Sequence, residues 1–417
     1  MNTIHSEPQW LSDLRAVAQE RAVRIGLPTL REEAWRFSDL RKLRAAMSPQ
    51  GEGVSSEITA EHIAPYFLPQ AAHRLVFVDG LLAPELSAIG ALPPGCWLAN
   101  WSETLAHRPQ LAEASFTATD TLGGRHFAAV NAAQFSDGMV LVLEPGVELP
   151  GIIELIQFST AAAPVHLRHF IQMGVGSAAT LLETAIGIGA ASSNGVTTVT
   201  LADAANLTHA KLQAEPETAV HLAEFRAQLG TTAKLNSFYL IQGAALSRQD
   251  IHAALAGTGA ELRLGGSYLL HGQQEATIVP VVDHQVAGCQ TTEIFKGVLE
   301  EQSHGVFLGS IIVREGADQT EAHQQNHNLL TGPQARIDTR PELTIYADEV
   351  KCSHGATVGD LDEAALFYLQ ARGITPDTAR QMLIAAFAVA AIDSAELPGI
   401  IADWLTTHLH ARLGAAA

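Results

Sequence analysis

Cysteine and positive charge are both scarce in this sequence. Its three cysteines, Cys96, Cys289 and Cys352, are too few and too widely separated for a framework of disulfide bonds, so we expect free thiols in a reducing compartment. The 25 lysines and arginines are outnumbered by 44 aspartates and glutamates, which gives a formal net charge of -19. Such a charge repels phosphate backbones and anionic lipid headgroups, so we expect neither a nucleic-acid partner nor a membrane partner.

Long apolar runs are absent as well. No stretch approaches the roughly 20 apolar residues that cross a bilayer. Glu7, Asp13 and Arg15 interrupt the amino-terminal region, where a signal peptide would need an apolar run. We therefore predict a cytoplasmic location. Hydrophobic residues nevertheless make up 47% of the 417 residues, which is enough for a large core, so disorder is not expected.

The sequence also lacks the short motifs of several enzyme classes. It has no GxxxxGK[ST] phosphate-binding loop, no GxSxG nucleophile elbow and no HExxH zinc motif. If ATP drives the work of this chain, we expect another subunit to bind it. A GxGxxA match at Gly174–Ala179 is followed by a short strand-like run instead of a helix, which favours a turn over a dinucleotide site.

The middle of the chain has a regular repeat of glycine. Gly230, Gly243, Gly257 and Gly272 are separated by 13, 14 and 15 residues, in a region of short runs rich in Val, Ile, Leu and Thr. This interval is too even for a sandwich with variable loops and too short for βαβ units, which need about 30 residues. A strand of roughly five or six residues plus a turn predicts a parallel β-helix, with a pair of β-sandwiches as the alternative.

Changes in pattern divide this mainly β chain into four parts. We predict a helical region over 1–73, a mixed connecting region over 74–137, the β-helix core over 138–359 and a second helical region over 360–417. The run at 382–392 is apolar nearly all round. This pattern predicts either a helix buried within its own domain or an exposed helix that awaits a partner.

Cys352 and His354 form the pair best suited to bind a metal. Residues two apart on a strand point to the same face, so the thiolate and the imidazole could converge on one soft or borderline ion such as iron. The pair supplies two donors where a closed tetrahedral site needs four, so others would come from elsewhere in the chain, from a partner or from sulfide. Two alternatives stay open: a buried cysteine beside a capping histidine, and a Cys–His hydrolase, which a pair on one strand suits least.

The segment around this pair resembles the carboxy-terminal signature of the SufB/SufD family of iron–sulfur cluster assembly scaffolds. Residues 346–357 read YADEVKCSHGAT, and Glu33–Phe37 reads EAWRF. Similar stretches extend the resemblance over nearly the whole chain: Phe127–Asn131, Lys296–Leu299, Phe307–Ser310, Arg336–Leu343, Leu361–Glu363 and Phe367–Ile374. The SufD branch is more similar than the SufB branch, since SufB sequences have an EHEA-like phrase where this chain has KCSHG.

The resemblance implies a right-handed parallel β-helix between helical ends, acting as a non-ATPase scaffold subunit of the SUF complex and not as an enzyme. It implies pairing with a SufB homologue through the β-helices, and docking of the ABC-type ATPase SufC on the carboxy-terminal helices at about 360–413. It also implies that His354, and less directly Cys352, help to hold iron or a transient iron–sulfur cluster near the SufB–SufD interface, with no intrinsic cofactor. Whether flavin binds the complex and whether Cys289 takes part in cluster chemistry stay open.

Three further interpretations are kept. The chain could be a SufB-like paralogue, because both branches share the fold. It could be a carbohydrate-active enzyme, because parallel β-helices often host that chemistry, although such an enzyme needs clustered acidic residues in a groove. In isolation, an edge that pairs with a related β-helix could also pair with itself and give a homodimer.

Overall fold

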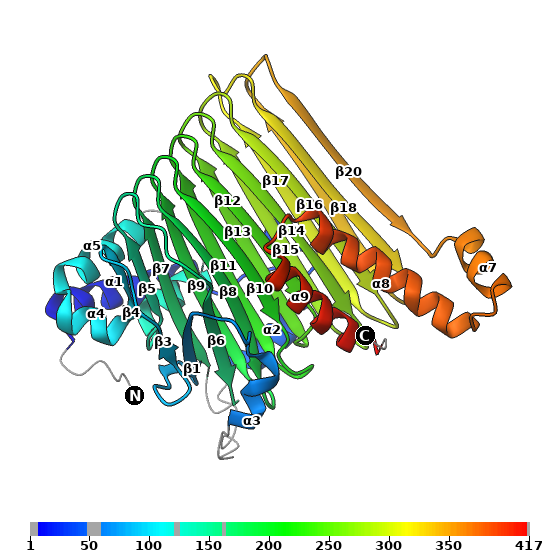
Figure 1. Ribbon diagram of the computed structural model, residues 1–417, viewed down its shortest axis with the longest axis horizontal. Coiled ribbons are helices and arrows are strands. Elements are labelled where there is room, and N and C mark those ends of the chain that lie inside the picture. The colour runs from blue at the N-terminus through cyan, green and yellow to red at the C-terminus, as the bar shows by residue number, and fades with distance from the viewer. Residues whose placement is uncertain (1–6, 48–59, 121–125, 161–163, 415–417) are drawn as a thin grey trace.

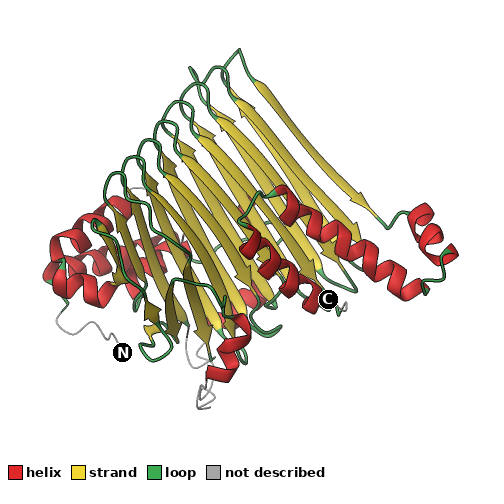
Figure 2. Cartoon of the chain, in the orientation of Figure 1, coloured by secondary structure: helices red, strands yellow, loops and turns green. Residues whose placement is uncertain are grey.

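The computed structural model describes residues 7–47, 60–120, 126–160 and 164–414, and it shows a parallel β-helix with helices at both ends of the chain (Figures 1 and 2). Strands make up 43% of the chain and helices 26%, so the predicted mainly β class is confirmed. The β-helix has about seven coils, and from β5 onward successive strands along the chain alternate between two sheets.

From β5 onward, one sheet holds the even-numbered strands and the other the odd-numbered strands, and neighbouring strands within each sheet are parallel. The even-strand sheet contains β6 (Ile153–Ser159), β8 (Ala178–Gly187), β10 (Asn206–Gln213), β12 (Lys234–Ile241), β14 (Glu261–Leu270), β16 (Gln290–Leu299), β18 (Glu321–Leu330) and β20 (Lys351–Gly359). The odd-strand sheet contains β5 (Met139–Leu143), β7 (Val165–Met173), β9 (Ser192–Leu201), β11 (Val220–Leu229), β13 (Leu246–Leu255), β15 (Glu275–His284), β17 (His304–Val313) and β19 (Arg336–Ile345).

The sheets begin within the segment predicted as a connecting region. β1 (His73–Val78) pairs parallel with β6 and carries the short antiparallel strands β2 (Leu81–Leu82) and β3 (Ala88–Ile89). β4 (Cys96–Asn100) pairs antiparallel with β5. The first coil therefore draws strands from residues that precede 138.

The glycine repeat marks the turns, as the sequence predicts. Gly230, Gly243, Gly257 and Gly272 all lie between the end of one strand and the start of the next. A Cβ atom on Gly257 would lie 1.9 Å from the backbone nitrogen of Thr231 on the neighbouring coil, so no larger residue fits there. Most strands in this part have eight to ten residues, longer than the five or six expected. The turns between them are correspondingly shorter than the sequence analysis assumed.

The main core fills the space between the two sheets. It consists of aliphatic and aromatic side chains from the inner faces of both, with Leu181, Phe225 and Phe307 among them. Cys289 belongs to this core and is fully buried, and its Sγ lies 3.3 Å from the carbonyl oxygen of Gly257. Burial raises the pKa of the Cys289 thiol, so this cysteine fills core space as an uncharged side chain.

The amino-terminal helices cover the outer face of the odd-strand sheet. Tryptophan and phenylalanine side chains, among them Trp101, Phe116 and Phe135, pack there with Phe170 of β7. Farther along the same face, Trp35 and neighbouring residues pack on β11 and β13. These helices are α1 (Gln9–Ile25), η1 (Glu33–Trp35), α2 (Leu40–Met47), α4 (Trp101–His107), α5 (Pro109–Asp120) and α6 (His126–Gln134). Two short helices, α3 (Ala60–Ile63) and η2 (Ala64–Tyr66), lie elsewhere, beside the first strands of the even-strand sheet.

The three carboxy-terminal helices are α7 (Glu363–Ala371), α8 (Pro376–Ser394) and α9 (Gly399–Arg412). α8 and α9 lie across the outer face of the even-strand sheet, and α7 extends beyond the end of the sheet after β20 (Figure 1). The apolar run at 382–392 lies in α8, where Ile384, Ala388 and Ile392 pack on the sheet. Both predictions for this run were therefore incomplete, because one face of α8 is buried on the β-helix itself. No helix in the described ranges combines the length and the apolar character that a membrane crossing needs.

Candidate functional site

The last coil of the β-helix is uncovered. Among the described residues, β20 pairs only with β18 and β19 only with β17, so each ends its sheet (Figure 1). No residue of β19 or β20 is buried, whereas at least half of the residues of β17 and of β18 are buried. Val358, for example, exposes 54% of its surface. An open parallel edge beside exposed apolar residues is a surface suited to pair with another chain.

Cys352 and His354 lie on β20 and face the interior of this open coil. Their register partners on β18 are Ala322 and Gln324, which are fully buried in the previous coil. Cys352 is half-buried against the main core, and burial raises the pKa of its thiol. His354 is exposed. The structure thus brings both predicted residues to the same face at the end of the β-helix.

This pair does not make a complete metal site within the part of the chain that the structure describes. No group of three or more His, Cys, Asp and Glu side chains is close enough there to hold a metal ion. A thiolate and an imidazole suit iron or zinc, but a tetrahedral site needs two further donors. The open edge is the place where a partner chain or sulfide could supply them.

Two polar residues that the sequence analysis missed lie directly behind His354. Gln324 occupies the rung next to His354, and Glu293 occupies the rung before Gln324. Gln324 Nε2 donates a hydrogen bond to Glu293 Oε1 at 3.2 Å, and both side chains are fully buried. Burial raises the pKa of Glu293 to about 8, so its carboxyl group is mostly protonated near neutral pH. Their separation of 31 and 30 residues, one coil each, is the sequence signal that could have found them.

A second group of polar side chains lies on the same inner face. Asn326 Nδ2 donates to Tyr268 Oη at 3.0 Å, and Thr339 Oγ1 donates to Asn326 Oδ1 at 2.8 Å. Tyr268 also hydrogen-bonds Asn328. These contacts link the last coils across the interior, so the open end is backed by a satisfied polar network as well as by apolar side chains.

The remaining histidines of the β-region have mainly structural contacts. His323 and His327 lie on the outer face of β18, each 2.8 Å from a hydroxyl group of β20, on Ser353 and Thr357. Burial lowers the pKa of His284 to about 4, so that side chain stays neutral. His284 Nε2 lies 2.9 Å from Thr291 Oγ1, so all three histidines have hydrogen-bond partners within the sheets.

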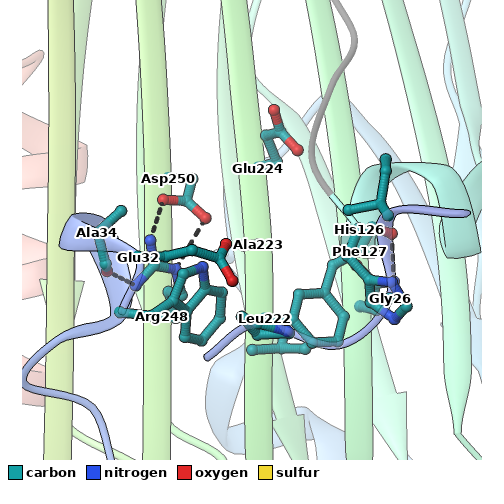
Figure 3. A pocket seen from close by; sticks show the side chains of 14 residues that line it. Gly26, Glu32, Ala34, His126, Phe127, Leu222, Ala223, Glu224, Arg248 and Asp250 are labelled. Carbon is teal, nitrogen blue, oxygen red and sulfur yellow. Dashed lines mark hydrogen bonds and ion pairs between the residues drawn. The ribbon is translucent and has the colours of Figure 1, made fainter. Parts of the chain in front are cut away.

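A cavity of about 150 Å³ lies on the outer face of the odd-strand sheet, beneath the amino-terminal segment (Figure 3). Arg248 makes two hydrogen bonds to Asp250 and lies over the ring of Trp35 at 3.8 Å. Glu224 accepts a hydrogen bond from Arg226 at 2.7 Å. Because these charged groups are paired with one another, we assign the cavity to the packing of the EAWRF segment on the sheet.

The carboxy-terminal helices carry an exposed apolar surface. Phe367 and Tyr368 on α7 expose 74% and 57% of their surfaces, and Met382 on α8 is also exposed. No residue of α7 is buried. A helix this apolar and this exposed is suited to contact a protein partner.

Comparison with known proteins agrees with this architecture. Residues 157–387 match the family described as "SUF system FeS cluster assembly, SufBD core domain". The chain is 30% identical to the SufBD family protein slr0076 of Synechocystis, over 95% of this chain and 90% of the relative. It is 28% identical to the iron–sulfur cluster assembly protein SufD of Escherichia coli, over 88% of this chain and 85% of the relative. It is also 27% identical to protein ABCI7 of Arabidopsis chloroplasts, over 90% and 81%.

The family match covers most of the β-helix, so the fold alone no longer argues for carbohydrate chemistry. It also includes the open coil with Cys352 and His354, and most of α8. The chain therefore belongs to the SufBD family of iron–sulfur cluster assembly proteins of the SUF system.

Proposed function

We propose that this chain is a non-ATPase scaffold subunit that pairs with a SufB-type subunit through its open β-helix end, with His354 and Cys352 at the nascent cluster. The observation that carries the proposal is the position of this pair, on the inner face of a strand that has β18 as its one neighbour in the part of the chain that the structure describes. A parallel β-helix normally covers its last coil, because uncovered backbone groups and apolar side chains favour association. A related β-helix edge would cover this coil and place its own donors beside the pair.

The chemistry of the pair suits iron and sulfide as the substrate. Because burial raises the pKa of Cys352, its thiol keeps its proton until a soft cation displaces it. His354 can bind iron through a neutral ring nitrogen without any charge compensation. The scaffold holds the two ligands in place for iron and sulfide, and a separate ATPase provides the energy for any movement of the coil.

The docking place that we propose for an ATPase of the SufC type is the exposed surface of α7 and α8. Phe367, Tyr368 and Met382 form its apolar part. The packing of α8 and α9 on the even-strand sheet gives a route by which a movement of the docked ATPase reaches the β-helix. In isolation, the open edge would pair with a second copy of the chain and give a homodimer.

The test is co-expression with the SufB- and SufC-type proteins of the same genome, purification through a tag on this chain, and anaerobic reconstitution with ferrous iron and sulfide. We expect a stable complex in which His354→Ala lowers the cluster yield without releasing a subunit. His323→Ala is the matched control, because His323 lies on the neighbouring strand but on the outer face. The proposal fails if no complex forms, or if His354→Ala and His323→Ala give the same yield as the wild type.

A further inference from the structure

A short polar row leads inward from His354. Glu293, Gln324 and His354 occupy corresponding positions on β16, β18 and β20, so their side chains lie on one face at intervals of about 4.8 Å. Leu264 on β14 occupies the next rung inward and ends the row. The row therefore ends inward at an apolar side chain, and its other end is at His354 on the exposed strand.

Two oxygen atoms in this row have no hydrogen-bond partner among the described residues. Neither Glu293 Oε2 nor Gln324 Oε1 has a hydrogen-bond partner among the described residues, although both side chains are fully buried. Proteins rarely leave buried oxygen atoms unpaired, because the loss of water is then uncompensated. Gln324 Oε1 is the unpaired acceptor on the rung next to His354, which indicates that a donor reaches it when the site is assembled.

The amide of Gln324 is held in one place. Its Nε2 donates to Glu293 Oε1 on one side, and on the other side Gly309 of β17 leaves the space that the amide fills. A Cβ atom at Gly309 would lie 2.4 Å from Gln324 Nε2. Because Gln324 Nε2 already donates to Glu293, Gln324 Oε1 is the atom of this amide that can accept a hydrogen bond from the next rung. His354 lies on that rung and carries a ring N–H.

We propose that Gln324, held by Glu293, is a positioning residue for His354: when a partner covers the last coil, Gln324 Oε1 accepts one ring N–H and leaves the other ring nitrogen for iron. This inference rests on the proposed role of His354. The second ring nitrogen of a metal-binding histidine commonly donates to a carbonyl or carboxylate oxygen, which fixes the tautomer and the orientation of the ring. Such a contact needs no charge on Gln324, so it can lie deep in the β-helix.

The first test is an anaerobic titration of the complete complex with Co²⁺ alone, followed by visible absorption. Removal of a contact of this kind typically weakens metal binding 10- to 100-fold, so we expect Gln324→Leu and Glu293→Leu each to raise the dissociation constant about 10-fold. Gln324→Glu keeps an acceptor and should restore binding. Gln249→Leu is the matched control, because Gln249 is a buried amide on the inner face of the other sheet; it should leave the dissociation constant unchanged.

The second test reads the ring directly. Magic-angle-spinning NMR of a complex in which only the histidines of this chain carry ¹⁵N gives the tautomer of His354, identified by its loss in His354→Gln. We expect a single tautomer in the wild type and a mixture in Gln324→Leu. Identical His354 signals in both proteins would overturn the inference.

The two proposals fail in different ways. If His354→Gln weakens Co²⁺ binding while Gln324→Leu leaves both the binding and the ring signals unchanged, the scaffold site stands and the positioning role is wrong. If His354→Gln leaves Co²⁺ binding unchanged, the proposed site is wrong, and the tautomer still decides whether Gln324 contacts His354. If no complex assembles, the proposed function is overturned, and the inference that rests on it is overturned with it.

Discussion

Lys211 Nζ lies 2.7 Å from Glu183 Oε1 in the middle of the β-helix, and both side chains are almost completely buried. His209 Nε2 approaches the same carboxylate at 3.5 Å, and Gln157 donates a hydrogen bond to it at 3.1 Å. Burial alone would raise the pKa of Glu183, but Lys211 and His209 hold it well below its ordinary value. An ion pair in this setting is retained only because each charge compensates the other.

Replacement of Lys211 by methionine should therefore be strongly destabilising. The Glu183 carboxylate would stay buried without its cation, and breaking one side of a buried pair costs about 3–5 kcal/mol. Urea unfolding followed by circular dichroism would measure the loss. The double variant Lys211→Met with Glu183→Leu removes both charges and should regain most of the stability. A double variant as unstable as the single one would contradict this account.

The sequence predicts much of this architecture because its turns are periodic. Gly230, Gly243, Gly257 and Gly272 mark successive turns, and the spacing of Cys352 and His354 is enough to place both on one face. The β-helix could therefore be predicted without knowledge of which distant residues touch, because each coil depends mainly on local turns and on stacking with its neighbours.

The row behind His354 could not be predicted in the same way. Glu293 and Gln324 carry no local motif, and their proximity depends on a register that one inserted turn residue would change. The burial of one face of α8 on the even-strand sheet is likewise a tertiary contact, because an apolar helix alone does not show which surface it covers.

His304 should make the stability of the β-helix depend on pH. Its Nε2 lies 2.8 Å from Asp338 Oδ2, and its Nδ1 lies 3.8 Å from Glu275, whose carboxylate also accepts the backbone N–H of Asp39. Burial alone would lower the pKa of His304, but Glu275 and Asp338 raise it above its ordinary value. The stabilisation is therefore fully present below the ordinary histidine pKa of about 6.5 and is lost as pH rises through the raised pKa.

His304→Gln removes this contribution, so the difference in free energy of unfolding between wild type and variant should be larger at pH 6 than at pH 9. Urea unfolding of both proteins at the two pH values measures it. A difference that is equal at both pH values would show that His304 stabilises the protein only through its packing.

Phe367→Asp should weaken the docking of the ATPase without changing the fold. The ring is mostly exposed in the chain alone, so the substitution removes few internal contacts. At the centre of an apolar interface, a buried aspartate should raise the dissociation constant at least tenfold, which corresponds to roughly 1.4 kcal/mol. Val17→Asp on α1 is the control, because Val17 is similarly exposed at the other end of the molecule. Equal affinities for the two variants would place the ATPase elsewhere.

Gly309→Ala should disturb the interior of the last coils, although it adds a single methyl group. The new Cβ would lie 2.4 Å from Gln324 Nε2 and 2.7 Å from Phe307 Cε1, closer than such atoms approach in folded proteins. Either the amide or the ring has to move, so we expect a destabilisation of about 1–3 kcal/mol in urea unfolding. Gly355→Ala on β20 is the control, because nothing lies within 4 Å of its Cβ position and its stability should be almost unchanged. If Gly309→Ala is as stable as Gly355→Ala, the amide of Gln324 is free to move, and Gly309 does not hold it against Glu293.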